Sequence, residues 1–145
     1  MQSELGWYYN DKEFTEDDIG DYLGFVYRIT ELSTGRFYLG KKIFWNRVAK
    51  PPLKGKKRRR ISRKASDWKD YYGSGPEIKK LVEQNGKAAY KREILRLCST
   101  KSEMGYYESK LIFETDALLR DDSINEWISC RITKGQLNAI RGKAI

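Results

Sequence analysis

The sequence contains no histidine and only two cysteines, Cys98 and Cys130. Without histidine, the chain cannot build a Ser-His-Asp or Cys-His nucleophile system, a histidine-rich zinc site or the catalytic centre of a histidine-based nuclease. Two thiols cannot form a disulfide framework or a four-thiolate zinc site. Because apolar residues lie near both cysteines, we expect both thiols to be buried and the compartment to be reducing. Any proton carrier that acts near neutral pH must therefore be tyrosine, lysine, glutamate or aspartate.

Long apolar runs are also missing. No stretch reaches the roughly 18 apolar residues that a membrane-spanning helix needs, so we expect no such helix. The first residues, Met1 to Glu4, contain no basic stretch followed by an apolar one, and we therefore expect no secretory signal. A length of 145 residues fits one domain with a modest core.

The chain is basic, with a formal net charge of +9, and the charge is unevenly distributed. Residues 1–21 hold seven acids and one base, whereas residues 41–70 hold thirteen lysines and arginines against two aspartates. We interpret residues 1–21 as an acidic N-terminal arm, 22–130 as the main domain and 131–145 as a basic C-terminal tail. The arm could lie over the basic segment and compete with nucleic acid.

The basic segment, residues 41–70, is expected to be an irregular loop because Pro51 and Pro52 interrupt regular structure. Such a density of positive charge favours a polyanionic partner, although a solvated loop without a partner would have the same composition. Aromatic side chains on both sides of its centre, residues 54–64, could stack on bases or pack beneath the loop. The residues that we expect to contact nucleic acid are Lys42, Lys56, Lys57, Arg58, Arg59, Arg60, Arg63, Lys64, Trp68 and Tyr72.

Two neighbouring segments predict a β-hairpin. Residues 22–30 and 36–44 are rich in aromatic and β-branched side chains, and Ser33-Thr34-Gly35 between them is a turn signal. A third strand is predicted over residues 89–98. The fold class predicted from these elements is α+β, with a small three-stranded antiparallel sheet flanked by helices.

Two helices are predicted around the third strand. Pro76 suits the first turn of a helix that ends at Gly86. Thr100-Lys101-Ser102-Glu103 has the pattern of a capping box and starts the longest helix, predicted over residues 101–119. Residues 123–132 are expected to be irregular or a short strand, and the tail from residue 133 has helical periodicity.

Glu108 stands out on the longer predicted helix. It lies four residues after Met104 and four before Ile112, which places a carboxylate on an apolar helix face. A carboxylate in that position needs a partner. That partner could be a metal ion, completed by water and phosphate oxygens as Mg²⁺ prefers, or a lysine or arginine from the sheet.

Tyr27 and Tyr38 lie on the two strands of the predicted hairpin, where their rings could approach each other. A phenol titrates near pH 10, so it would need a nearby cation to act as a base or a strong donor. Lys41, Lys42 or Arg47 could supply that cation. Most strand tyrosines, however, have only a packing role.

The two strands also resemble the start of a GIY-YIG nuclease domain. Phe25-Val26-Tyr27 stands where the family has Gly-Ile-Tyr, and Tyr38-Leu39-Gly40 is similar to Tyr-Ile-Gly. Glu108 matches the metal-binding glutamate of the family, and Asn125 is similar to the asparagine that often follows it and is expected to contact DNA. The resemblance covers about residues 22–128, and the block Trp68 to Ser74 looks like small, phage-encoded, homing-type members.

The resemblance implies hydrolysis of a DNA phosphodiester with one divalent metal, Mg²⁺ or Mn²⁺, held by Glu108. Tyr27 would act as a general base or position the attacking water, and Tyr38 would contact the phosphate or assist the water. Lys41 matches a lysine of some members and could bind phosphate. Arg47 is nearest in spacing to the family's catalytic arginine, but one of Arg58, Arg59, Arg60 or Arg63 could take that role.

Two alternatives to an active nuclease stay open at this level. One is a catalytically inactive nucleic-acid-binding module that uses the basic segment, and the other is a structural RNA-associated protein. The partner expected for the nuclease is DNA, with no membrane and no small-molecule cofactor beyond the metal. The expected location is cytoplasmic, in a bacterial host if the protein is phage-encoded, and the oligomeric state is left open.

Overall fold

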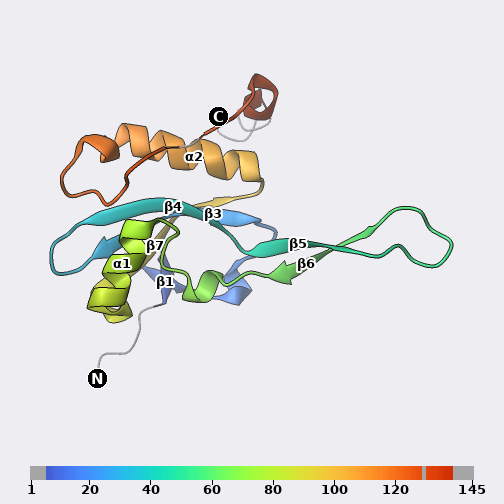
Figure 1. Cartoon of the computed structure of the whole chain (residues 1–145), viewed down its shortest axis with the longest axis horizontal. Coiled ribbons are helices and arrows are strands. Elements are labelled where there is room, and N and C mark those ends of the chain that lie inside the picture. The colour runs from blue at the N-terminus through green and yellow to red at the C-terminus, as the bar shows by residue number, and fades with distance from the viewer. Residues whose placement is uncertain (1–5, 129, 139–145) are drawn as a thin grey trace.

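The computed structural model describes residues 6–128 and 130–138, and its main element is a five-stranded mixed sheet with the strand order β2-β1-β7-β3-β4 (Figure 1). A separate two-stranded sheet is formed by β5 and β6. In chain order the strands are β1 (Trp7–Tyr9), β2 (Lys12–Phe14), β3 (Gly24–Glu31), β4 (Phe37–Ile43), β5 (Trp45–Lys50), β6 (Arg60–Ala65) and β7 (Tyr90–Cys98). The helices are α1 (Pro76–Asn85), α2 (Lys101–Glu114) and the short 3-10 helices η1 (Glu16–Asp18), η2 (Trp68–Asp70), η3 (Lys87–Ala89) and η4 (Ala117–Leu119).

The α+β class is confirmed, but the main sheet has five strands, whereas three were predicted. β3 pairs antiparallel with both β4 and β7, as the hairpin and the third strand predicted. β1 extends this sheet parallel to β7, and β2 pairs with β1. The extension forms because Trp7 is buried, with its ring 4.8 Å from that of Phe25. Part of the predicted acidic arm thus packs on the core; the predicted boundaries at residues 21 and 131 stay predictions, and residues 1–5 and 139–145 lie outside the described part.

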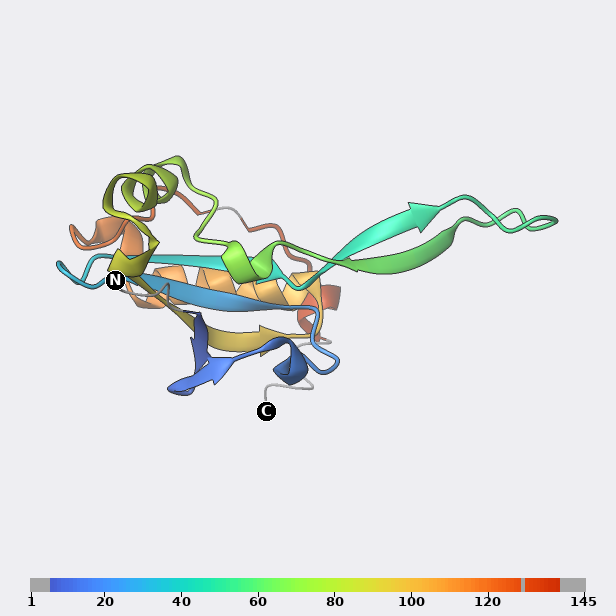
Figure 2. The same cartoon turned by 90° about the horizontal axis from the view of Figure 1, so that it is seen from below.

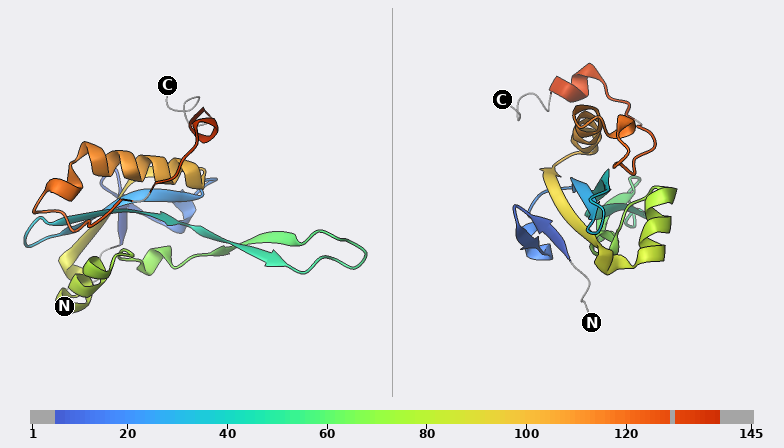
Figure 3. Two further views of the ribbon diagram at one scale, coloured as in Figure 1. Left: turned by 45° about the horizontal axis from the view of Figure 1, so that its top comes forward. Right: turned by 90° about the vertical axis from the view of Figure 1, so that its left-hand side faces the viewer.

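The central strand β3 separates two apolar layers. Phe25, Tyr27 and Ile29 belong to the larger cluster, which also contains Ile78 of α1. Val26 points to the other face and packs with Met104 of α2. Figure 3 shows α1 and α2 on opposite faces of the sheet. This alternation explains why the strand is apolar on both sides.

Both helices begin as predicted, and α1 also ends as predicted, but α2 is shorter than expected. Thr100 accepts a hydrogen bond from the backbone N–H of Glu103, so the predicted cap starts α2. α1 stops at Gly86, whose φ of 84° suits glycine. α2 was predicted to reach residue 119 but ends at Glu114, because Asp116 adopts a left-handed conformation with φ of 53° and turns the chain.

The basic segment is not an irregular loop, which corrects the prediction from its two prolines. β5 and β6 form an antiparallel pair in which Trp45 lies opposite Ala65 and Lys50 opposite Arg60. Pro51 and Pro52 follow the last residue of β5 and lie in the connection at the tip, so they end the strand without interrupting it. We call residues 45–65 the basic ribbon. Figures 1 and 2 show that it projects away from the five-stranded sheet and from both helices.

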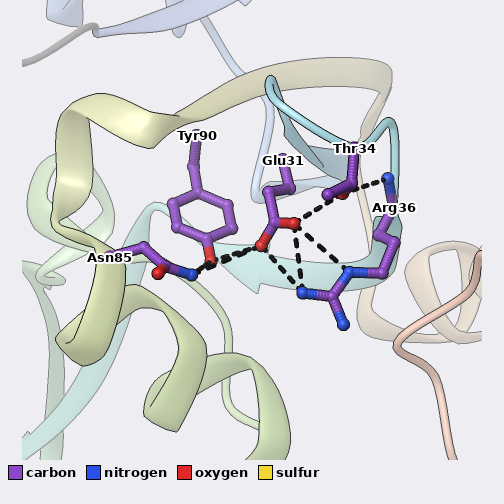
Figure 4. A network of polar contacts seen from close by, with 5 residues as sticks. All are labelled: Glu31, Thr34, Arg36, Asn85 and Tyr90. Atoms are coloured by element: carbon purple, nitrogen blue, oxygen red, sulfur yellow. Dashed lines mark hydrogen bonds and ion pairs between the residues drawn. The ribbon is translucent and has the colours of Figure 1, made fainter.

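A buried polar network holds α1 against the turn between β3 and β4 (Figure 4). The Glu31 carboxylate is 2% exposed and accepts hydrogen bonds from Thr34 at 2.5 Å, Tyr90 at 2.9 Å and Arg36 at 3.1 Å. Asn85, the last residue of α1, donates to the Tyr90 hydroxyl at 3.0 Å. Because each polar atom has a partner, the network fixes the helix relative to the hairpin.

The two cysteines differ in their surroundings. Cys98 is buried, as predicted, and burial raises the pKa of its thiol to about 12. Cys130 is exposed and belongs to none of the apolar clusters, so the prediction of two buried thiols was wrong for this residue. None of the helices among the described residues has the length and apolar character needed to cross a lipid bilayer.

Candidate functional site

A cleft of about 270 Å³ lies along the free edge of β4. Its walls come from four parts of the chain: β4, the start of α1, the middle of α2 and residues 124–127. β4 is the last strand of the sheet, so side chains from both of its faces can reach the same opening. The lining residues are Tyr38, Leu39, Lys41, Ser74, Gly75, Pro76, Glu77, Ile78, Glu108, Ile112, Ile124, Asn125, Glu126 and Trp127.

Tyr38 is held by the segment that leads into α1. Its phenol interacts with the Ser74 side chain and the Gly75 backbone, and these contacts oppose the effect of burial, which on balance raises the pKa of Tyr38. Gly75 allows the close approach, because a β-carbon there would lie 3.3 Å from the Tyr38 ring. Gly73, with φ of 101°, turns the chain immediately before. The backbone of residues 73–75 therefore sets the orientation of the Tyr38 phenol.

Glu108 and Lys41 reach the cleft from the other face of the sheet. The carboxylate of Glu108 is half-buried, and burial raises its pKa while the charge of Lys41 opposes the rise. The Lys41 ammonium lies above Gly105, one turn before Glu108, where a β-carbon would be 3.5 Å from its Nζ. A lysine and a carboxylate thus approach the cleft side by side.

Tyr27 lies directly behind the cleft and is fully buried. Its ring centroid is 6.3 Å from that of Tyr38 and 5.9 Å from that of Tyr71. Burial, together with the neighbouring phenols, raises the pKa of Tyr27 well above its usual value. Among the described residues, no group makes a hydrogen bond of ordinary geometry with its hydroxyl. The Tyr71 side chain interacts with this hydroxyl and adds to the rise in its pKa, but a buried hydroxyl without a well-formed hydrogen bond is costly.

One known protein family matches most of the chain, including the residues that line the cleft. Residues 7–129 match the family described as "Putative endonuclease segE, GIY-YIG domain". The chain belongs to the GIY-YIG endonuclease family. No curated protein and no solved structure matches it.

The two motifs of this GIY-YIG domain are joined by a backbone contact. Tyr27, the last residue of the first motif, lies opposite Gly40, the last residue of the second. A β-carbon at position 40 would lie 2.3 Å from the Tyr27 hydroxyl oxygen, so only glycine leaves room for the phenol. Gly24 has a comparable constraint, because a β-carbon there would be 2.5 Å from the carbonyl oxygen of Lys42. The glycine one residue before the first triplet is therefore needed for packing.

Other residues that the sequence predicted for DNA contact have structural partners in this GIY-YIG domain. Lys42 forms an ion pair with Asp67 at 2.6 Å and lies 4.3 Å from the centre of the Tyr71 ring. Trp68 and Tyr72 are buried in the core, 3% and 7% exposed, and their rings are not available for stacking on a base. Aromatic residues beside a basic segment thus fill the core beneath it.

Asn125 lines the cleft, but its amide holds β4. The side-chain oxygen of Asn125 accepts a hydrogen bond from the Leu39 N–H at 2.9 Å, and its nitrogen donates to the Leu39 carbonyl at 2.8 Å. The Ile124 N–H donates to the Phe37 carbonyl at 2.7 Å. These bonds satisfy the open edge of β4 next to Tyr38.

Arg47 lies outside the cleft, on β5, opposite Arg63 on β6. Arg58, Arg59 and Arg60, the alternatives for a catalytic arginine, are also in the basic ribbon. Within the described part of the chain, Lys41 is the single cationic side chain that lines the cleft.

Several lining residues were not predicted from the sequence. Trp127 is 66% exposed at the rim, and Glu77 and Glu126 add carboxylates to the lining. Ser74 contacts Tyr38. The sequence predicts only an irregular segment or a short strand over residues 123–132, because nothing in the local pattern shows that residues 124–127 return to β4.

Proposed function

We propose that this chain is a metal-dependent endonuclease that hydrolyses DNA phosphodiester bonds at the β4-edge cleft. The observation that carries this proposal is the meeting of three groups of different chemistry in one opening: the Tyr38 phenol, the Lys41 ammonium and the Glu108 carboxylate. Membership of a nuclease family supports it. The positive net charge favours a polyanionic substrate.

The donor set of the cleft fits a hard divalent cation. Glu108 offers carboxylate oxygens in a partly desolvated position, which is the ligand type that Mg²⁺ and Mn²⁺ prefer. No group of three metal-ligating side chains occurs among the described residues, so water and substrate oxygens would complete the shell. A bound cation would stabilise negative charge on the phosphate and on the leaving oxygen.

The other side chains would bind and orient the reacting groups. Lys41 would attract a phosphate oxygen to the cleft, because its ammonium is the cation of the lining. The raised pKa of Tyr38 keeps its phenol protonated at neutral pH, so it would donate a hydrogen bond to the phosphate while its oxygen accepts one from the attacking water. Tyr27 would position the water or the phosphate from behind through the proton of its unpaired hydroxyl.

The test uses supercoiled plasmid with the full chain, in Mg²⁺ or Mn²⁺ and in chelator. We expect nicking or linearisation that requires metal and is lost in Glu108→Gln. Glu114→Gln is the matched control. Glu114 is on the same helix but is exposed, and it forms only a surface ion pair with Lys110 at 3.8 Å. Equal cutting by Glu108→Gln and the wild-type protein would contradict the proposal.

A second candidate is a binding module that holds nucleic acid without cutting it. The observation in its favour is that Glu108 stands without two further metal-ligating side chains among the described residues. The same plasmid assay separates the two candidates. A salt-sensitive gel shift without cutting in any metal would favour the binding module.

A further inference from the structure

The basic ribbon has no acidic residue and no aromatic residue beyond its first position. Residues 45–65 contain ten lysines and arginines, and the nearest acidic positions in the sequence are Glu31 and Asp67. No carboxylate forms an ion pair with a ribbon cation in the described part of the chain. The ribbon thus carries about a third of the chain's cations, five on two strands that form a sheet of their own and five in the connection at its tip.

Like charges lie directly opposite each other on both faces of the ribbon. Arg47 pairs with Arg63, and Lys50 pairs with Arg60, with all four side chains exposed. Like charges at directly opposite positions destabilise a β-pair, and a two-stranded sheet is marginal even without them. Anions on both sides of the ribbon would remove this repulsion.

The root of the ribbon is fixed to the core, so its direction is set by the body of the protein. Phe44 is fully buried, and its ring is 5.2 Å from that of Trp68. The Ser66 N–H donates to the Phe44 carbonyl at 2.8 Å, and the Ser66 hydroxyl donates to the Ile43 carbonyl at 2.5 Å. β4 ends at Ile43 and β5 begins at Trp45, so the ribbon continues the strand that carries Tyr38 and Lys41.

We propose that the basic ribbon inserts into the major groove of double-helical DNA while the cleft engages a phosphodiester further along the same duplex. This inference rests on the proposed function and specifies how the substrate is held. A major groove about 12 Å wide admits a two-stranded ribbon, whereas a minor groove about 6 Å wide does not without deformation. The two phosphate backbones then flank the ribbon on either side, within reach of the long lysine and arginine side chains that project from both of its faces.

Single-stranded nucleic acid fits the ribbon less well. Proteins that hold single strands offer exposed aromatic rings on which bases stack. Between Asn46 and Ala65 the ribbon has no such ring, and Trp45 is half-buried at the root. One face of the ribbon carries hydrogen-bonding side chains that suit base edges and phosphates, such as Asn46, Ser62 and Lys64.

The continuity of β4 and β5 sets the distance between the two contacts. Extended strand rises about 3.4 Å per residue, so the stretch from Lys41 to the segment between Asn46 and Lys50 spans about 17 to 31 Å. Duplex DNA rises about 3.4 Å per base pair. The ribbon contacts are therefore placed about five to nine base pairs from the cleaved bond.

The test measures binding of the full chain to a thirty-base-pair duplex in chelator, so that cutting is not required. We expect Arg63→Glu to weaken binding at least tenfold and to lower the salt slope by about two, since one cation is lost and one anion gained. The glutamate can also pair with Arg47 across the strands, so the ribbon should be more stable while it binds less. Lys80→Glu on α1 changes the net charge equally and should have a much smaller effect.

The groove is identified with modified duplexes. Bulky substituents at the 5-position of the thymines fill the major groove in every register, and they should weaken wild-type binding about tenfold or more. A ligand bound in the minor groove of the unmodified duplex should change the affinity of the wild-type protein little. If the minor-groove ligand blocks binding instead, if Arg63→Glu behaves like Lys80→Glu, or if a single strand binds equally well, the proposal is overturned.

Two further measurements keep the interpretation unambiguous. Thermal unfolding shows whether Arg63→Glu folds, and Lys50→Glu, opposite Arg60, repeats the test on the other face of the ribbon. Because binding is measured without metal, a protein that binds through the major groove but never cuts leaves this inference standing while the nuclease proposal fails. A protein that cuts DNA but binds the substituted duplex as tightly as the unmodified one supports the nuclease proposal and overturns this inference.

Discussion

The hydroxyl of Tyr27 lies against the α-carbon of Gly40 on the neighbouring strand, so closely that a β-carbon would be 2.3 Å from its oxygen and 2.4 Å from Cζ. The first and second motifs of the domain are thus one packing unit. We predict that Gly40→Ala destabilises the fold by about 1–3 kcal/mol, because the added methyl overpacks a buried site. It should also lower the cutting rate, because Tyr27 must move.

Chemical denaturation measures the stability of Gly40→Ala. Gly135→Ala is the control, since its nearest atom outside the adjacent residues is the Thr133 hydroxyl oxygen, at 3.9 Å from the added β-carbon. An unchanged denaturation midpoint for Gly40→Ala would show that the strands adjust without cost.

The unpaired hydroxyl of Tyr27 leads to the second prediction, in which stability and activity change in opposite directions. Tyr27→Phe removes a buried hydroxyl that makes no hydrogen bond of ordinary geometry, so the protein should be more stable by about 1–3 kcal/mol. If the hydroxyl contacts the reacting groups, the cutting rate should fall roughly 100-fold or more.

Tyr90→Phe provides the comparison for Tyr27→Phe, because its hydroxyl donates to Glu31 at 2.9 Å. That variant should be less stable, because it leaves part of a buried carboxylate without a partner. A Tyr27→Phe protein that is less stable and cuts at the wild-type rate would assign the tyrosine a packing role only.

The third prediction concerns acid stability. Hydrogen bonding from Thr34, and then from Tyr90 and Arg36, lowers the pKa of Glu31 against the opposing effect of burial. The stability that this carboxylate contributes is therefore present above its unfolded pKa, near 4.3, and is lost as the pH falls through the lower folded pKa. Wild-type protein should lose stability more steeply below about pH 4.3 than Glu31→Gln.

Urea denaturation at pH 3 to 7 checks this difference. At pH 7, Glu31→Gln should already be less stable by about 1–3 kcal/mol, because the amide cannot accept the full set of hydrogen bonds. Glu83→Gln on the exposed side of α1 should keep the wild-type pH dependence. Parallel curves for Glu31→Gln and wild type would show that the carboxylate contributes no proton linkage.

The fourth prediction concerns the exposed ring at the rim of the cleft. Trp127 is 66% exposed and lines the same opening as Glu108. Stacking of this ring on a base next to the cleaved bond would contribute about 1–3 kcal/mol, so Trp127→Ala should raise KM about 5- to 150-fold. Trp127→Phe should restore much of the affinity, and Leu119→Ala, 84% exposed on η4, should change nothing.

The strands and helices that carry the motifs follow from the sequence because their patterns are local. Phe25, Tyr27 and Ile29 alternate with residues of the other face, and Pro76 and Gly86 mark the two ends of α1. The capping pair of Thr100 and Glu103 starts α2 where it was predicted. Such signals depend on neighbours in the chain, so a single sequence is enough to interpret them.

Features that depend on distant partners were missed. β1 and β2 have three residues each, too short for an alternating pattern, and they form only because Trp7 packs on Phe25. The basic ribbon lacks the apolar face by which strands are predicted. Trp68 lies next to the cationic segment in the sequence but under it in space, where the Trp7 indole donates to its carbonyl at 2.7 Å.

The candidate site likewise combines residues that the sequence predicted with residues whose position depends on distant partners. Tyr38, Lys41 and Glu108 were predicted from the sequence, and the structure brings them to one cleft. Asn125 was predicted to bind DNA, but its two bonds to Leu39 show what its amide does in this chain. No local pattern shows that residues 124–127 come back across 86 positions to the edge of β4.

The hydrogen bond between Phe44 and Ser66 brings the two ends of the ribbon together at the surface of the body. A segment whose ends already meet can be lengthened, shortened or exchanged at little cost to the rest of the fold, since the entropy of closing a loop changes slowly with its length. The end of β4 can thus carry ribbons of different length or sequence at this junction while the cleft stays intact. If the ribbon binds DNA as proposed, insertion and deletion at this junction change which DNA is bound without changing the cleft.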